Sequence, residues 1–72
     1  MMDGWVVQFS SSDIIKALTK DGFTLARQKG SHLVFTRAGH PFHVTVPNGR
    51  KTLATGTVRN IYRQANWAWP PC

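Results

Sequence analysis

The chain has 72 residues, which is enough for one small domain and too few for a separate regulatory domain. Nine lysine and arginine residues against three acids give a net charge of +6, which favours a partner rich in phosphate or carboxylate groups. The hydrophobic share of 42% argues against disorder, and the single cysteine, Cys72, excludes an internal disulfide.

The first predicted helix follows a run of serines. Residues 1–9 form an N-terminal lead that is either flexible or a short additional strand. Ser10, Ser11 and Ser12 then offer side-chain oxygens for an N-cap, and the following Asp13 suits the positive end of a helix. The apolar stripe of this helix consists of Ile14, Ile15, Ala17 and Leu18. Gly22 ends the helix in a left-handed conformation.

Three alternating segments follow and predict an antiparallel sheet. Residues 23–29 alternate large and small side chains before becoming polar, and Gly30-Ser31 supplies a turn. Residues 32–37 predict the second strand, and residues 42–46 predict the third. The short connections make these strands a meander.

The second predicted strand places a histidine opposite its large apolar side chains. Leu33 and Phe35 share one face, so His32 points to solvent if those two residues point to the core. Arg27 and Lys29, in the preceding strand, lie on the same side as each other. Strand alternation alone leaves their distance from His32 open.

A second helix is predicted after Gly56-Thr57, with an apolar stripe of Val58, Ile61, Tyr62 and Ala65. Each helix has one stripe, so both helices cover the same face of the sheet and the other face meets solvent. The predicted fold is therefore α+β, in the order α-β-β-β-α, over residues 10–66. In the tail of residues 67–72, Trp67 and Trp69 either fold back on the core or meet a partner.

Acidic residues are confined to the first third of the chain. From Gly22 onward, no carboxylate side chain opposes the basic residues, which are Arg27, Lys29, Arg37, Arg50, Lys51, Arg59 and Arg63. This basic set is either the footprint of a nucleic-acid binder or a solvated surface. No apolar run is long enough for a membrane span, the N-terminus lacks the order of a signal peptide, and no cysteine–histidine spacing suits zinc. We therefore expect a cytoplasmic protein without membrane contact, metal or cofactor.

Several short motifs are spread along these predicted elements. They are Gly22-Phe23, Arg27, Gly30-Ser31-His32, Val46-Pro47, Gly56-Thr57, Ile61 and Gln64. Their spacing resembles that of the HicA family of small RNA-cleaving toxins, from about Ser11 to Ala65. The resemblance implies a fold like the double-stranded-RNA-binding domain. It also implies the toxin half of a type II toxin–antitoxin pair, which cleaves mRNA and is neutralised by a HicB-type antitoxin.

The resemblance places the catalytic histidine of the family at His32. An imidazole exchanges protons near neutral pH, which suits acid–base cleavage of RNA without a metal, because the ribose 2′-hydroxyl is the nucleophile. Nearby cations would stabilise the phosphate charge. The predicted RNA-binding residues are Arg27, Lys29, Ser31, Arg37, Arg50 and Lys51. Arg59 and Arg63 share a face of the second helix, which suits an acidic antitoxin surface or RNA backbone.

The sequence departs from the family pattern at one place and leaves other functions open. Members of the family often carry another histidine after the strand-ending proline, where this chain has Asn48-Gly49-Arg50. Ser31 is not expected to be a nucleophile. All three acids precede Gly22, and none is a convincing partner to orient a histidine base. His40 and His43 are interpreted as surface residues. The alternatives to a nuclease are a non-catalytic RNA-binding module and a basic adaptor for an acidic protein.

Overall fold

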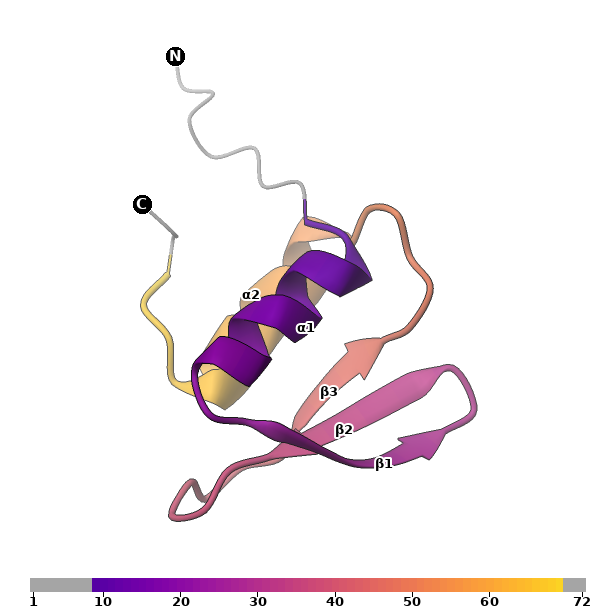
Figure 1. The fold of residues 1–72 in the computed structure, drawn as a ribbon. Helices are drawn as coiled ribbons and strands as arrows, with labels where there is room; N and C mark the ends of the chain where they lie inside the picture. The colour runs from indigo at the N-terminus through magenta and orange to yellow at the C-terminus, as the bar shows by residue number, and fades with distance from the viewer. Residues whose placement is uncertain (1–8, 70–72) are drawn as a thin grey trace.

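The computed structural model describes residues 9–69, so residues 1–8 of the lead and 70–72 of the tail lie outside it. Its elements are α1 (Ser11–Lys20), β1 (Thr24–Lys29), β2 (His32–Thr36), β3 (Val44–Pro47) and α2 (Thr55–Ala65). The strands form one antiparallel sheet in the order β1-β2-β3. Both helices lie on one face of this sheet (Figure 1). The predicted α+β fold is therefore confirmed.

A capping box fixes the start of α1. The Ser10 Oγ accepts from the Asp13 backbone N–H at 3.1 Å, and the Asp13 carboxylate accepts from the Ser10 N–H at 3.0 Å. The backbone N–H of Ser10 lowers the pKa of Asp13 because it stabilises the charged carboxylate. At the other end, Gly22 takes a positive φ of 96° just after the helix, as predicted.

The core lies between the helices and the sheet. Its buried members come from all the elements except β1: Ile14 and Leu18 in α1, Leu33 and Phe35 in β2, Val44 and Val46 in β3, and Val58, Ile61 and Ala65 in α2, together with Phe23 and Leu53 from connections. Ile15 and Tyr62 are partly buried and pack against this core, so Ala17 is the one member of the two predicted stripes that is exposed. Neither helix of residues 9–69 has the length and apolar character needed to cross a membrane.

Several predicted element boundaries were wrong by one to three residues. The second strand ends at Thr36 rather than at Arg37, and the third ends at Pro47 rather than at Val46. The third strand begins at Val44 rather than at Phe42, whose side chain is 59% exposed. Phe23 precedes β1 although its ring is buried. The second helix begins at Thr55, so Gly56 and Thr57 lie inside its first turn rather than before it.

A β-bulge interrupts β1. Leu25 pairs with Phe35, but the next pair joins Arg27 to Val34, so Ala26 is an extra residue on this strand. Phe35 belongs to the core, which places Leu25 on the helix-covered face of the sheet. Beyond the bulge the alternation is shifted by one residue. Without the bulge, Arg27 and Lys29 would point to the same face as Leu25, toward the helices. With the bulge, they point to the face that carries no helix.

The two tail tryptophans pack against the core, which corresponds to the first of the two predicted alternatives. Trp67 and Trp69 both make edge-to-face contacts with the Tyr62 ring, at centroid distances of 5.1 and 5.3 Å. The Trp67 indole N–H also donates to the Asp21 carboxylate at 2.9 Å. Asn66, in the left-handed conformation at φ 64°, ends α2 and turns the chain back toward α1.

Candidate functional site

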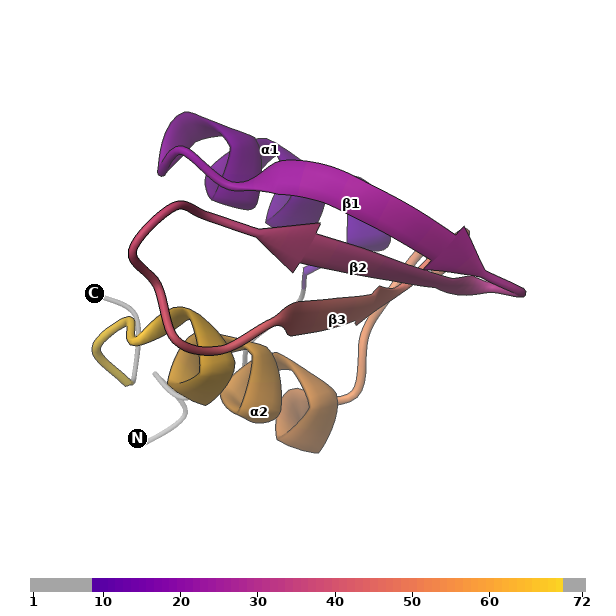
Figure 2. The ribbon, with the colours of Figure 1, turned by 90° about the horizontal axis from the view of Figure 1, so that it is seen from below.

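His32 is the first residue of β2 and lies exposed on the sheet face that carries no helix. Leu33 and Phe35, whose side chains point to the other face of β2, are buried. Figure 2 looks onto this open face, with both helices beyond the sheet. Gly30, in the turn just before His32, takes a positive φ of 61°, a conformation that glycine adopts without strain. The orientation expected from the sequence is therefore observed.

Lys29 and Pro47 flank His32 on its two sides. The sheet register pairs His32 with Lys29 of β1 and with Pro47 of β3. Side chains that are directly opposite in an antiparallel sheet share a face, with their Cβ atoms about 4.5–5.5 Å apart. The structure thus places Lys29 directly beside His32 on the open face, which alternation alone did not establish.

The next row of the open face contains Arg27. This residue pairs with Val34, which in turn pairs with Thr45. Val34 is only 8% exposed and is not a member of the core cluster, so its neighbours on the open face cover it. Arg27 is a diagonal neighbour of His32, at a typical Cα distance of about 7–8 Å. Both cations reach this face because of the bulge at Ala26.

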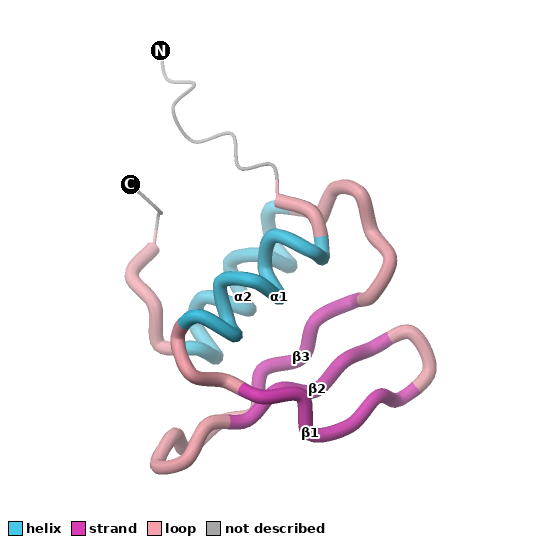
Figure 3. The backbone as a smooth tube through the Cα atoms, in the orientation of Figure 1, coloured by secondary structure: helices cyan, strands magenta, loops and turns pink. Residues whose placement is uncertain are grey.

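The loop after β3 brings further basic residues to the same end of the sheet. The Asn48 backbone N–H donates to the carbonyl of Ser31 at 2.6 Å, which joins this loop to the turn before His32. Figure 3 shows the course of the loop after β3 and of the turn between β1 and β2. Arg50 and Lys51 are exposed in this loop. The structure therefore places five of the six predicted RNA-binding residues at the His32 end of the sheet: Arg27, Lys29 and Ser31 next to His32, and Arg50 and Lys51 in the loop beside the first turn of α1.

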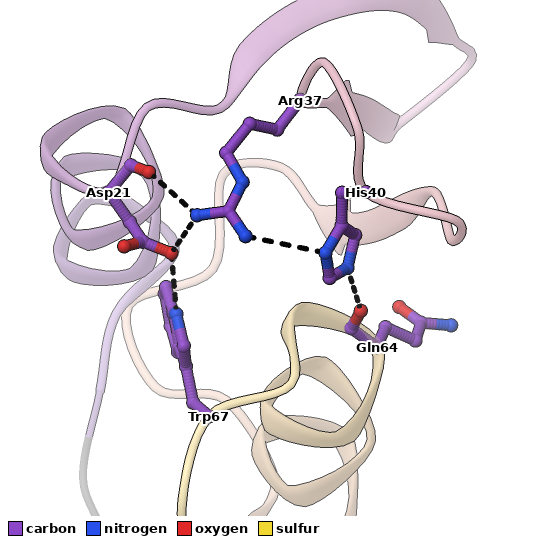
Figure 4. A network of polar contacts seen from close by, with 5 residues as sticks. All are labelled: Asp21, Arg37, His40, Gln64 and Trp67. Carbon is purple, nitrogen blue, oxygen red and sulfur yellow. Dashed lines mark hydrogen bonds and ion pairs between the residues drawn. The ribbon is translucent and has the colours of Figure 1, made fainter.

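Arg37, the sixth, lies at the other end of β2 and is engaged within the fold. Its guanidinium forms an ion pair with the Asp21 carboxylate at 3.1 Å, donates to the Asp21 carbonyl at 3.1 Å, and lies 4.8 Å from the centre of the Phe23 ring. Figure 4 shows the contacts of Arg37 with Asp21 and with His40. No other ion pair occurs within residues 9–69. The cations around His32 therefore face solvent without a described carboxylate partner.

His40 belongs to the same network, and its interpretation as a surface residue was wrong. Its ring is half-buried, packs edge-on against Phe23, and donates from Nε2 to the carbonyl of Gln64 at 2.7 Å (Figure 4). Nδ1 faces the Arg37 guanidinium at 3.4 Å and can only accept there, so the neutral Nε2–H tautomer fits both contacts. Gln64 is 24 residues away in sequence, and no local pattern signals this contact. His43 is exposed, as expected.

Arg59 and Arg63 lie on α2 and are separated from His32 by the core and the sheet. Both side chains are exposed, and Arg63 donates to Asn60 at 2.8 Å. Together with Asn66, Trp67 and Trp69 they line a groove between α2 and the tail. The molecule therefore presents two basic surfaces, one on each side of its sheet.

These features define a class of protein, namely a small basic α+β domain with one exposed histidine among cations on an open sheet face. The family model described as the HicA toxin of bacterial toxin–antitoxin systems matches residues 11–67. The chain therefore belongs to the HicA toxin family of bacterial toxin–antitoxin systems. No curated protein matches it.

Proposed function

We propose that this toxin is a cytoplasmic endoribonuclease that cleaves mRNA, with His32 as its acid–base group. The observation that carries the proposal is the pairing of exposed His32 with Lys29 on the open face of the sheet. An imidazole beside an ammonium group suits a phosphodiester substrate, because one group moves a proton and the other stabilises negative charge.

The reaction follows from the chemistry of RNA. The neutral His32 imidazole accepts the proton of a ribose 2′-hydroxyl as that oxygen attacks the adjacent phosphorus. The bond from phosphorus to the 5′-oxygen breaks, and this leaving oxygen takes up a proton from water on the open face. The products carry a 2′,3′-cyclic phosphate and a 5′-hydroxyl. The nucleophile belongs to the substrate, so this route requires no metal ion.

The surrounding cations have separate tasks in this proposal. Lys29 and Arg27 stabilise the negative charge that develops on the phosphate, since they share the open face with His32. Arg50 and Lys51 bind neighbouring phosphates from the loop after β3, next to Ser31. Arg37 is left out of this surface because Asp21 already holds its guanidinium.

Cleavage of RNA in excess chelator tests this proposal. The His32→Ala variant is expected to lose about 10²–10⁴-fold in rate relative to the wild type, which is the usual contribution of a general acid–base group. His43→Ala is the matched control, because this exposed histidine lies outside the site. Equal cleavage by wild type and His32→Ala would remove His32 from the mechanism. A folded wild type that binds RNA without cutting it would favour the RNA-binding module.

We further propose that a HicB-type antitoxin neutralises the protein and that it binds the groove on α2. Arg59 and Arg63 line this groove beside two half-buried indoles, and no ion pair within residues 9–69 neutralises either arginine. Acidic side chains next to an apolar one would complement such a surface.

A further inference from the structure

Ser11 is the one polar residue within residues 9–69 that is buried, at 3% exposure. Its hydroxyl is not needed to cap α1, because Ser10 already forms the capping box with Asp13. A buried hydroxyl costs stability unless it is hydrogen-bonded. The hydrogen-bond partners of the Ser11 hydroxyl therefore indicate its structural role.

The Ser11 hydroxyl binds both ends of residues 47–50, which are the last residue of β3 and the start of the loop after it. Its Oγ donates to the Pro47 carbonyl at 2.6 Å and accepts from the Arg50 backbone N–H at 3.0 Å. The Ser11 backbone N–H also donates to the Arg50 carbonyl at 2.9 Å. These three bonds tie residues 47–50 to the first turn of α1, across at least 36 residues of sequence.

The same segment supports the turn that precedes His32. Asn48, between the two residues that Ser11 binds, donates its N–H to the Ser31 carbonyl at 2.6 Å. Pro47 is also the partner of His32 in the register of β2 and β3. The chain of contacts therefore runs from Ser11 to residues 47–50, and from there to Ser31 and His32.

We infer that Ser11 is a positioning residue for His32, acting through residues 47–50. The expected effect on RNA cleavage rests on the proposed nuclease function; the expected effect on residues 47–50 does not. Without the hydroxyl, the partly buried Arg50 N–H and Pro47 carbonyl lose a shared partner. Residues 47–50 then separate more readily from α1, and the contact between Asn48 and Ser31 weakens with them.

The test compares Ser11→Ala with Ser11→Thr, which restores a hydroxyl, and with Thr19→Ala. Thr19 is the matched control because its exposed hydroxyl bonds only within α1, to the carbonyl of Ile15 at 2.8 Å. In Ser11→Ala, amide hydrogen exchange at Asn48 is expected to accelerate about tenfold, as is usual when a buried polar group loses its partner. The kcat for RNA cleavage should fall by a similar factor with little change in KM. Ser11→Thr should recover both values, and Thr19→Ala should alter neither.

Two results would overturn the inference. One is unchanged exchange at Asn48 in folded Ser11→Ala; the other is faster exchange with an unchanged kcat. If wild type cuts no RNA, the nuclease proposal fails, and the NMR resonances of the Ser31 amide and the His32 ring decide the inference instead. A shift in Ser11→Ala alone supports the positioning role, and unchanged resonances exclude it. If Ser11→Ala does not fold, Ser11→Cys keeps the volume with a weaker hydrogen-bonding group and undergoes the same measurements.

Discussion

At the scale of single residues, Ala26 has more influence on the candidate site than its methyl side chain suggests. As the extra residue of the bulge, it changes which face of the sheet the following side chains of β1 point to. Phe23 is fixed in the core before the bulge. Arg27 and Lys29 can therefore reach the open face only because one residue is inserted between them and the buried part of the chain.

Deletion of Ala26 tests this role. The deletion is expected to turn Arg27 and Lys29 toward the helix side, because Phe23 holds its place and β1 is exposed along its whole length. RNA cleavage should fall about a hundredfold, the cost of losing a charge-stabilising donor. Circular dichroism should show the fold retained. Ala26→Ser is the control, since it keeps the residue count and should cleave at the wild-type rate. Full activity after the deletion would show that the bulge does not set the orientation.

At the scale of elements, the ends of α1 were the easiest part of the structure to predict. Ser10 and Asp13 form the capping box within four residues of sequence, and Gly22 supplies the left-handed residue after the helix. Such local motifs depend on neighbours in sequence alone. The lowered pKa of Asp13 shows that the first of these motifs also carries an electrostatic contribution.

This cap predicts how the protein responds to acid. The pKa of Asp13 is lower in the folded chain than its ordinary value of 3.8, so the folded state binds this proton less tightly than the unfolded state does. The stabilisation is present above pH 3.8 and is lost as the pH falls through the folded pKa. Asp13→Asn should therefore unfold with a weaker dependence on pH below about 4, measured by urea denaturation at several pH values. An unchanged dependence on pH would exclude Asp13 as a source of acid sensitivity.

The candidate site was predictable in part, for a physical reason. Alternation around Leu33 and Phe35 was sufficient to turn His32 toward solvent, because it depends on a single strand. The pairing of His32 with Lys29 depends on the register between two strands and on a bulge. The burial of Ser11 depends on a loop at least 36 residues away. Neither of these two features leaves a pattern in the local sequence.

At the scale of the whole molecule, the sheet and the core separate two basic surfaces. His32 and its cations occupy the open sheet face, whereas Arg59 and Arg63 lie on α2. Figures 1 and 2 show α2 on the other side of the sheet from that open face. Changes on one surface should therefore leave the chemistry of the other intact, since additivity holds for distant sites.

Charge reversal on α2 tests the proposed antitoxin surface. The double variant Arg59→Glu, Arg63→Glu is expected to bind a HicB-type antitoxin about tenfold more weakly or worse, because like charges then face each other. Its RNA cleavage should match that of wild type. The double variant Lys16→Glu, Lys20→Glu reverses two exposed charges on α1 and changes the net charge by the same amount, so it is the control. Calorimetry measures the affinity of each variant for the antitoxin. Equal affinities of the two variants would place the interface elsewhere.

The exposed edge of β1 has a consequence for solubility. In the order β1-β2-β3, β1 has a neighbour on one side only, and an unpaired edge can recruit a strand from another copy of the chain. A bulge and two cations are the features that discourage such pairing, and β1 carries both around Ala26. The side chains proposed to hold the phosphate therefore also keep the molecules apart. Variants that neutralise Arg27 and Lys29 would lose colloidal stability together with catalysis.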